Sequence, residues 1–167
     1  ADKAEADKAE QAKQEALKAK AQPVVDAIAA IGEVTLDGEE AITAARSAYE
    51  ALEADVKAKV TNLSDLVVAE KNLALLKAEK ESQDKDAAVA ASVSSAITAI
   101  GEVTLDKRGV VAAARAAYDT LSDVQKSLVT NYSDLQAAES RIAELVKEAA
   151  DKAEADKAEQ AKQEALK

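Results

Sequence analysis

One stretch of this chain occurs twice and decides how the rest is interpreted. Residues 24–37 read VVDAIAAIGEVTLD, and residues 93–106 read VSSAITAIGEVTLD. In both copies the aliphatic residues before the glycine are spaced three and four apart, as on one face of an amphipathic helix. The glycines, Gly32 and Gly101, stand where a helix C-terminus adopts a left-handed conformation. The stretch therefore predicts a helix that ends at glycine and is followed by a turn.

The similarity between the copies extends well beyond this stretch. Residues 24–79 align without gaps on residues 93–148 at a shift of 69, with about 29 of 56 positions identical. A second repeat is unchanged in every residue: ADKAEADKAEQAKQEALK occupies both 1–18 and 150–167, at a shift of 149. Repeats of this length indicate a tandem array. The two shifts imply that one junction between units is 11 residues longer than the other.

Each copy predicts three helices with recognisable ends. The second helix follows EVTLD, where Asp37 is expected to cap it and Glu40 to complete a capping box. A short helical turn should come next, opened in the second copy by Ser122. The third helix is expected to be capped by Ser64 in the first copy and Ser133 in the second.

The inward faces of these helices form the predicted core. Their members are mostly aliphatic, recur at helical spacing in both copies, and include one tyrosine in each. They are Val24, Ile28, Ile31, Ile42, Ala45, Tyr49, Leu52, Leu66, Ala69, Leu73 and Leu76, matched by Val93, Ile97, Ile100, Val111, Ala114, Tyr118, Leu121, Leu135, Ala138, Ile142 and Leu145. Val34 and Leu36, in the turn after the first helix, are expected to cover the end of the bundle.

The junction between the copies is predicted to be helical. Residues 77–92 contain no Gly or Pro and are mostly Ala, Lys, Glu and Asp, so one helix is expected from about Ser64 to Ile100. An 11-residue insertion advances an α-helix by three turns and about 20°, which preserves phase only if the junction is itself helical. Pro23 is the one helix breaker, and a bend or restart of the helix is expected at Gln22–Pro23.

The predicted fold class is all-α: two tandem three-helix bundles in a spectrin-like arrangement, joined by a continuous shared helix, with helical spacers at both ends. The predicted segments are an Ala/Glu/Lys spacer at 1–22, a first bundle at 23–79, a helical linker at 80–92, a second bundle at 93–148, and a spacer at 149–167 that begins the next block. The ADKAE segments have no continuous apolar stripe and resemble helical rods, so they are expected to be exposed to solvent.

The composition excludes several classes of function. The chain has no His and no Cys, which removes the imidazole base, the thiolate nucleophile and the usual zinc ligands. Its 32 acidic and 22 basic side chains give a net charge of -10, which argues against nucleic acid as a partner. No apolar run approaches the roughly 20 residues of a membrane span, so no membrane insertion is expected. We expect a protein that is not an enzyme, with no catalytic, cofactor-binding or metal-binding residues and no cofactor.

Arginines and tyrosines recur at matched positions and could bind a partner. Arg46 and Arg115 could grip a ligand, but a stem packed on the bundle, with the guanidinium on a carboxylate such as Glu33 or Glu102, is the preferred interpretation. The tyrosine three residues after each arginine is expected in the core, with its hydroxyl at the rim. Tyr132 replaces the leucine of the first copy, so partial exposure and a role in binding remain open.

Three further groups of polar residues have structural explanations. Asn62 and Asn131 are expected to serve turn geometry. The acidic pairs Glu39–Glu40 and Asp84–Asp86 could suggest acid–base chemistry or calcium binding, but they lack EF-hand spacing, so a solvated face is expected. The serines within Ser92–Ser95 have no histidine to activate them.

The pattern AIGEVTLD…AARxAYxxL…K…VTN…LxxAE resembles the helical tandem repeats of large surface proteins and extracellular enzymes of Gram-positive bacteria. The resemblance covers both copies but not the ADKAE segments. It implies a non-catalytic module that is extracellular and associated with the bacterial cell wall. Because the chain begins with Ala1 rather than Met, an excised or processed fragment is expected.

The function expected from these features is mechanical: a semi-rigid stalk or spacer that projects another domain from the cell surface. Its partners would be neighbouring repeats of the same chain, and the acidic surface predicts a monomer. The alternative is an adhesin-type module that binds a host protein, such as albumin, immunoglobulin or a matrix protein, through a helical face.

Overall fold

The computed structural model describes residues 2–165, and every regular element in that range is helical, as the sequence predicts. Ala1 and residues 166–167, which belong to the predicted end spacers, lie outside the described residues. The chain divides into two compact units, Ala1–Glu81 and Ser82–Lys167.

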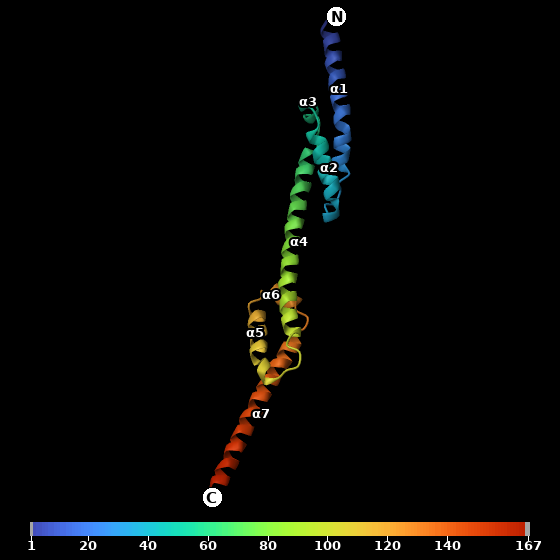
Figure 1. Ribbon diagram of the computed structural model, residues 1–167. Helices are drawn as coiled ribbons and strands as arrows, with labels where there is room; N and C mark the ends of the chain where they lie inside the picture. The colour runs from blue at the N-terminus through green and yellow to red at the C-terminus, as the bar shows by residue number, and fades with distance from the viewer. Residues whose placement is uncertain (1, 166–167) are drawn as a thin grey trace. The chain divides into compact units, whose positions relative to one another are not determined.

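The first unit is built from four α-helices and one 3-10 turn. They are α1 (Asp2–Ala29), η1 (Leu36–Gly38), α2 (Glu39–Glu50), α3 (Ala54–Lys57) and the N-terminal part of α4 (Leu63–Thr98). In Figure 1, α2 lies alongside the C-terminal part of α1, with which it is in contact. The core of this unit joins α1, α2 and α4 through Val24, Ile28, Ile42, Ala45, Leu66, Ala69 and Leu73. These seven members of the predicted helix faces are confirmed as core. Ile31, Tyr49 and Leu52 are half-buried against it, and Leu76, also half-buried, lies outside it.

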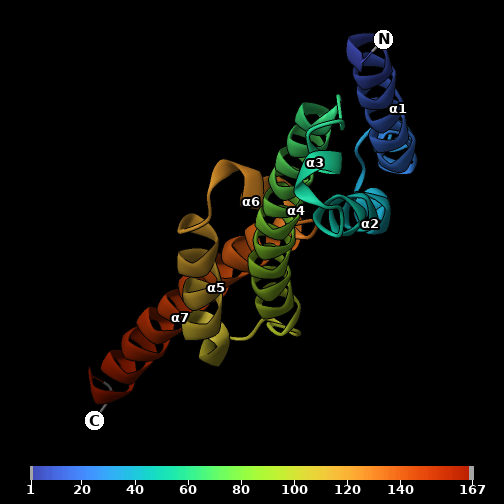
Figure 2. The ribbon, with the colours of Figure 1, turned by 90° about the horizontal axis from the view of Figure 1, so that it is seen from above.

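The second unit repeats this plan. After the C-terminal part of α4 come η2 (Leu105–Lys107), α5 (Arg108–Asp119), α6 (Asp123–Leu128) and α7 (Tyr132–Ala165). Figure 2 shows α5 beside α7, and the two helices are in contact. The core residues are Ala90, Val93, Ile97, Ile100, Val111, Ala114, Leu121, Val129, Leu135, Ala138 and Ile142. Leu135 is fully buried, as is its counterpart Leu66 in the first unit.

Helix α4 runs without interruption through the stretch between the two cores. It spans 36 residues and includes 77–92, which the sequence predicts to be helical. Its N-terminal part supplies Leu66 and Leu73 to the core of the first unit, and its C-terminal part supplies Val93 and Ile97 to that of the second. A single element thus carries core residues of both units.

The turn after the first helix of each unit follows the sequence in part. Gly32 and Gly101 have φ values of 62° and 60°, which confirms the predicted left-handed glycines. Val34 packs against the core, as predicted. Leu36 was predicted to cover the bundle end as well, but it is 39% exposed. The reason is that residues 36–38 form the 3-10 turn η1, which carries Leu36 outward before α2 begins.

Three of the predicted helix caps, at Asp37, Ser64 and Ser133, are wrong because the helices begin elsewhere. Asp37 lies inside η1, and α2 has Gly38 as its N-cap with no side-chain cap. Ser64 and Ser133 lie at the second residue of α4 and α7 rather than before them. The cap predicted at Ser122 is confirmed: its side chain accepts a hydrogen bond from the backbone of Gln125, whose own side chain returns one in a capping box.

Pro23 does not interrupt α1. The helix passes through it, so a restart at Gln22–Pro23 is wrong, whereas the expected bend stays a prediction. Proline removes the hydrogen bond that its N–H would donate to the carbonyl four residues earlier. That carbonyl belongs to Ala19, an exposed residue, where water can replace the missing donor. On either side of the proline, Ala21 and Val24 are buried, so packing holds both halves of the helix.

The sequence predicts that the N-terminal spacer is exposed to solvent along its whole length, but only part of it is. Residues 3–13 are exposed, but Gln14 and Leu17 are half-buried and Ala21 is 1% exposed. Gln14 and Leu17 line a hollow together with residues of α3 and its C-cap. The end of the predicted spacer thus packs against the first unit. The opposite end of the chain differs, because residues 146–165 of α7 are exposed.

Candidate functional site

The main polar feature of the first unit is a bridge between α2 and α4. Arg46 of α2 donates two hydrogen bonds to Glu70 of α4, from Nε to Oε1 at 2.6 Å and from Nη2 to Oε2. The guanidinium carbon also lies 5.7 Å from the ring centroid of Tyr49. The expected carboxylate partner is confirmed, but it is Glu70 and not Glu33, the example that the sequence suggested. Glu33 follows the end of α1, whereas Glu70 is presented by the facing helix in the two-pronged geometry that a guanidinium matches best.

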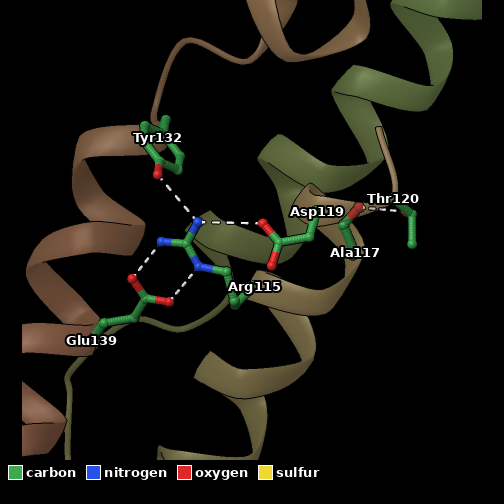
Figure 3. Close-up of polar contacts among 6 residues, drawn as sticks. All are labelled: Arg115, Ala117, Asp119, Thr120, Tyr132 and Glu139. Atoms are coloured by element: carbon green, nitrogen blue, oxygen red, sulfur yellow. Dashed lines mark hydrogen bonds and ion pairs between the residues drawn. The ribbon is translucent and has the colours of Figure 1, made fainter. Parts of the chain in front are cut away.

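The second unit has the same bridge with two additional partners, drawn in Figure 3. Arg115 of α5 donates from Nε and Nη2 to the carboxylate of Glu139 on α7, in place of the expected Glu102. Its Nη1 donates to the hydroxyl oxygen of Tyr132 at 3.1 Å and lies 3.5 Å from Asp119 Oδ1. The guanidinium is therefore held on three sides and is not available to grip a ligand.

Tyr132 is accounted for by the same cluster. Its ring stacks on that of Tyr118, with centroids 4.3 Å apart and an interplanar angle of 19°. It packs against the core of the second unit, and the guanidinium carbon of Arg115 lies 5.2 Å from its ring centroid. The replacement of a leucine by tyrosine thus extends an internal contact. The contact between Tyr132 and Arg115 could not be predicted from the first copy, because Leu63 has no polar atom that could bond to Arg46.

The bridges perturb the charges of their members in the direction of mutual stabilisation. Hydrogen bonds from the arginines lower the pKa of Glu70 and of Glu139, against an opposing effect of burial. The same hydrogen bonds raise the pKa of Arg46 and Arg115. Each side chain is about a third exposed, so solvent screens the interaction and limits its contribution to stability. The facing arginines thus favour the ionised form of Glu70 and of Glu139.

Asn62 and Asn131 tie the turn before the third helix of each unit to the first helix. Asn62 Nδ2 donates to the carbonyl oxygen of Val25 at 3.0 Å. Asn131 Nδ2 donates to the carbonyl oxygen of Ser94 at 2.9 Å and to Thr98 Oγ1 at 3.1 Å. The predicted structural role is confirmed. Each asparagine bonds to a residue 37 positions earlier in the sequence.

One member of each acidic pair, and one of the serines, form side-chain hydrogen bonds or ion pairs. Glu39 forms an ion pair with Lys77, and Asp86 Oδ1 accepts a hydrogen bond from Gln125 Nε2 at 2.8 Å. Ser95 Oγ donates to the carbonyl oxygen of Ala91, within its own helix. Within residues 2–165, no cluster of three or more acidic side chains has the arrangement of a metal site. Within the same range, no helix combines the length and apolarity that crossing a membrane requires.

A hollow in the surface of the first unit lies between the end of α1, the turn after it and α4. It has a volume of about 480 Å³ and is lined by apolar residues that include Ile31, Val34 and Val68. An adjoining hollow of about 390 Å³ shares Val34 and extends along α4 to Leu75 and Leu76. The equivalent hollow of the second unit measures about 290 Å³. All three hollows are open to solvent.

No family model matches this chain, and no curated protein or solved structure matches it either. Functional inference therefore rests on the repeats and on the geometry of the two units.

Proposed function

We propose that this chain is a non-catalytic structural repeat, two tandem three-helix bundles in a spectrin-like arrangement that share one helix. In this proposal the repeat forms part of a semi-rigid stalk of a bacterial cell-surface protein and projects another domain from the cell. The observation that carries the proposal is α4, an unbroken helix of 36 residues with core positions near both ends.

A helix anchored at both ends resists bending in its middle. Each turn is held by backbone hydrogen bonds, and a sharp kink requires proline, a glycine pair or an inserted group. The segment 77–92 has neither Gly nor Pro. Burial of Leu73 at one end and Val93 at the other fixes the helix to each core. Orientation would then pass along α4 from one bundle to the next.

The end segments support the same idea for the longer junction. The described residues of both ADKAEADKAE segments are helical: residues 2–10 open α1, and residues 150–159 lie in α7, which also supplies Ile142 to a core. In the parent array, α7 would continue into the α1 of a following block. The 11 additional residues of that junction would lengthen the connection by about 16 Å.

The acidic surface suits an isolated rod. A net charge of -10 favours solubility and opposes lateral association of like copies, so we propose a monomer. The proposed location, outside the cell and attached to the wall, rests on the resemblance of the AIGEVTLD and AARxAY motifs to Gram-positive surface repeats.

Electron–electron distance measurements between two spin labels test the stiffness directly. The chain has no Cys, so Ala27→Cys and Ala137→Cys, at exposed sites in different units, provide unique attachment points. We expect a narrow distance distribution that broadens when Ala88→Pro is introduced into α4, because proline breaks or kinks a helix interior. Ala158→Pro in the exposed end of α7 is the matched control and should leave the distribution narrow. A broad distribution in the unaltered protein would refute the stalk.

A further inference from the structure

The first unit exposes an apolar groove that its own packing does not require. We call it the unit 1 groove: the two adjoining hollows bounded by Ile31 and Val34 on one side and by Val68 and Leu75 of α4 on the other. Val68 is 55% exposed and Leu75 is 60% exposed. Large aliphatic side chains gathered in one exposed place typically mark an interaction site.

The second unit shows that these residues are not needed for the fold. At the shift of 69 residues, Val68 corresponds to Ala137 and Leu75 to Glu144. Glu144 forms an ion pair with Arg141 at 3.0 Å, and Arg141 also reaches Glu148 at 3.2 Å. A charged network thus occupies the surface that is aliphatic in the first unit, although Leu66 and Leu135 beneath are equally buried.

The spacing of the two aliphatic residues indicates the shape of an occupant. Val68 and Leu75 are seven residues apart on one helix, so they lie on the same face about 10 Å apart along the axis. An amphipathic helix that enters a groove anchors itself with residues spaced three, four and seven apart. The groove runs along α4 with Ile31 and Val34 as its opposite wall, which suits a helix laid parallel to α4.

The charge at the groove indicates the chemistry of the occupant. Glu33 and Asp65 are exposed and line the groove. A partner with Lys or Arg beside its apolar face would complement them, and electrostatic complementarity selects partners and speeds association. A second copy of this chain fits poorly, because each copy carries a net charge of -10.

We propose that the unit 1 groove docks a basic amphipathic helix of another protein. Aliphatic side chains of that helix would pack against Val68 and Leu75, and its Lys or Arg residues would face Glu33 and Asp65. Because every lining residue belongs to the first unit, this docking is independent of the stalk and would survive if the stiffness of α4 were disproved.

The test uses the full chain and a synthetic helical peptide of about four turns, with Leu on one face and Lys on the other. A second peptide replaces each Lys by Glu. We expect the basic peptide to bind with micromolar affinity and to shift the backbone amide signals of Gly32 and Val68 in a titration followed by NMR. The acidic peptide should bind at least about tenfold more weakly, because it repels the rim of the groove.

The deciding variant carries Val68→Ala and Leu75→Glu, the residues that the second unit has at these positions. It adds an acidic group, which alone would strengthen attraction for the basic peptide. A loss of affinity of about tenfold or more would therefore report the missing apolar contact. Val124→Glu, at a site in the second unit that is also 60% exposed, is the matched control and should bind as the unaltered chain does.

Three results would overturn the proposal. Equal binding of the basic peptide to the variant and the unaltered chain would reduce the effect to bulk charge. Equal binding of both peptides would remove the role of Glu33 and Asp65. Self-association that disappears with Leu75→Glu, measured by sedimentation, would assign the groove to a second copy.

Discussion

The two units have matching helices but different side chains at some packed positions, as a comparison of α3 with α6 shows. In the second unit, Gln125 of α6 donates a hydrogen bond to Asp86 of α4. At the matching positions of the first unit stand Val56, which is 2% exposed, and Leu17, which is half-buried. The two positions thus hold aliphatic residues in the first unit and polar residues in the second. The two units therefore share the helices at these positions, whereas both side chains differ in chemical type.

The largest effect should come from the positions at which the units do not differ. Leu66→Ala and Leu135→Ala each empty a site that is 0% exposed, so each should lower the free energy of unfolding by about 2–5 kcal/mol. Urea unfolding followed by circular dichroism measures the loss. Leu75→Ala, on α4 but 60% exposed, should change the stability by less than about 0.5 kcal/mol. Equal losses for Leu66→Ala and Leu75→Ala would contradict the assigned core.

Mixing the two chemistries should cost less but remain measurable. Val56→Gln places an amide in an aliphatic site without a partner, which should cost about 1–3 kcal/mol. Adding Leu17→Asp recreates the pair found at Gln125 and Asp86 and should recover about 1 kcal/mol of that loss. A double-mutant cycle in urea isolates the coupling. Strict additivity of the two changes would show that residues 17 and 56 do not interact.

Exchanging the residue beside the arginine bridges should have a smaller effect. Tyr132→Leu converts the second unit to the arrangement of the first and removes a hydrogen bond to Arg115 and the stack on Tyr118. The expected loss is about 1 kcal/mol, since the leucine still fills much of the site. Thermal unfolding of this variant beside Tyr118→Leu measures it. A stabilised Tyr132→Leu protein would mean that the tyrosine serves something other than packing.

The smallest expected effect is the pH dependence of the bridges. Because the pKa of Glu70 and Glu139 is lowered by folding, the bridges contribute stability above the ordinary carboxyl pKa. That contribution disappears as the pH falls through the lowered value. Glu139→Gln should therefore reduce stability at pH 7, by less than about 1 kcal/mol given the exposure of the pair, and reduce it less at pH 3. Urea titrations at both pH values measure the difference. An equal effect at both would exclude a charged interaction.

Periodicity and backbone conformation were predictable from the sequence. Apolar spacing located the buried faces of α1, α2, α4, α5 and α7, since burial follows directly from the helical repeat. The left-handed turns at Gly32 and Gly101 followed because few other residues adopt that conformation without strain. Apolar spacing and the position of a glycine are both local features of the sequence. Either copy alone therefore predicts the buried faces and the left-handed turn.

Partner choice across helices was not predictable in the same way. Arg46 had several carboxylates within plausible reach, and only the relative rotation of α2 and α4 selects Glu70 over Glu33. The caps at Asp37 and Ser64 failed because a 3-10 turn or an earlier start shifts a helix end by one or two residues, and cap signals do not fix an end more closely than that. The restart predicted at Pro23 is wrong because the energetic cost of proline inside a helix depends on whether water can bond to the freed carbonyl.

The burial of Ala21 and the half-burial of Gln14 and Leu17 set the smallest piece of this protein that should fold alone. A recombinant fragment cut at Pro23, where the motif alignment begins, would strip away the residues that cover α3 and leave Val56 facing water. A fragment begun near Lys13 keeps them. By the same shift, a fragment of the second unit should begin near Ser82, well upstream of Val93.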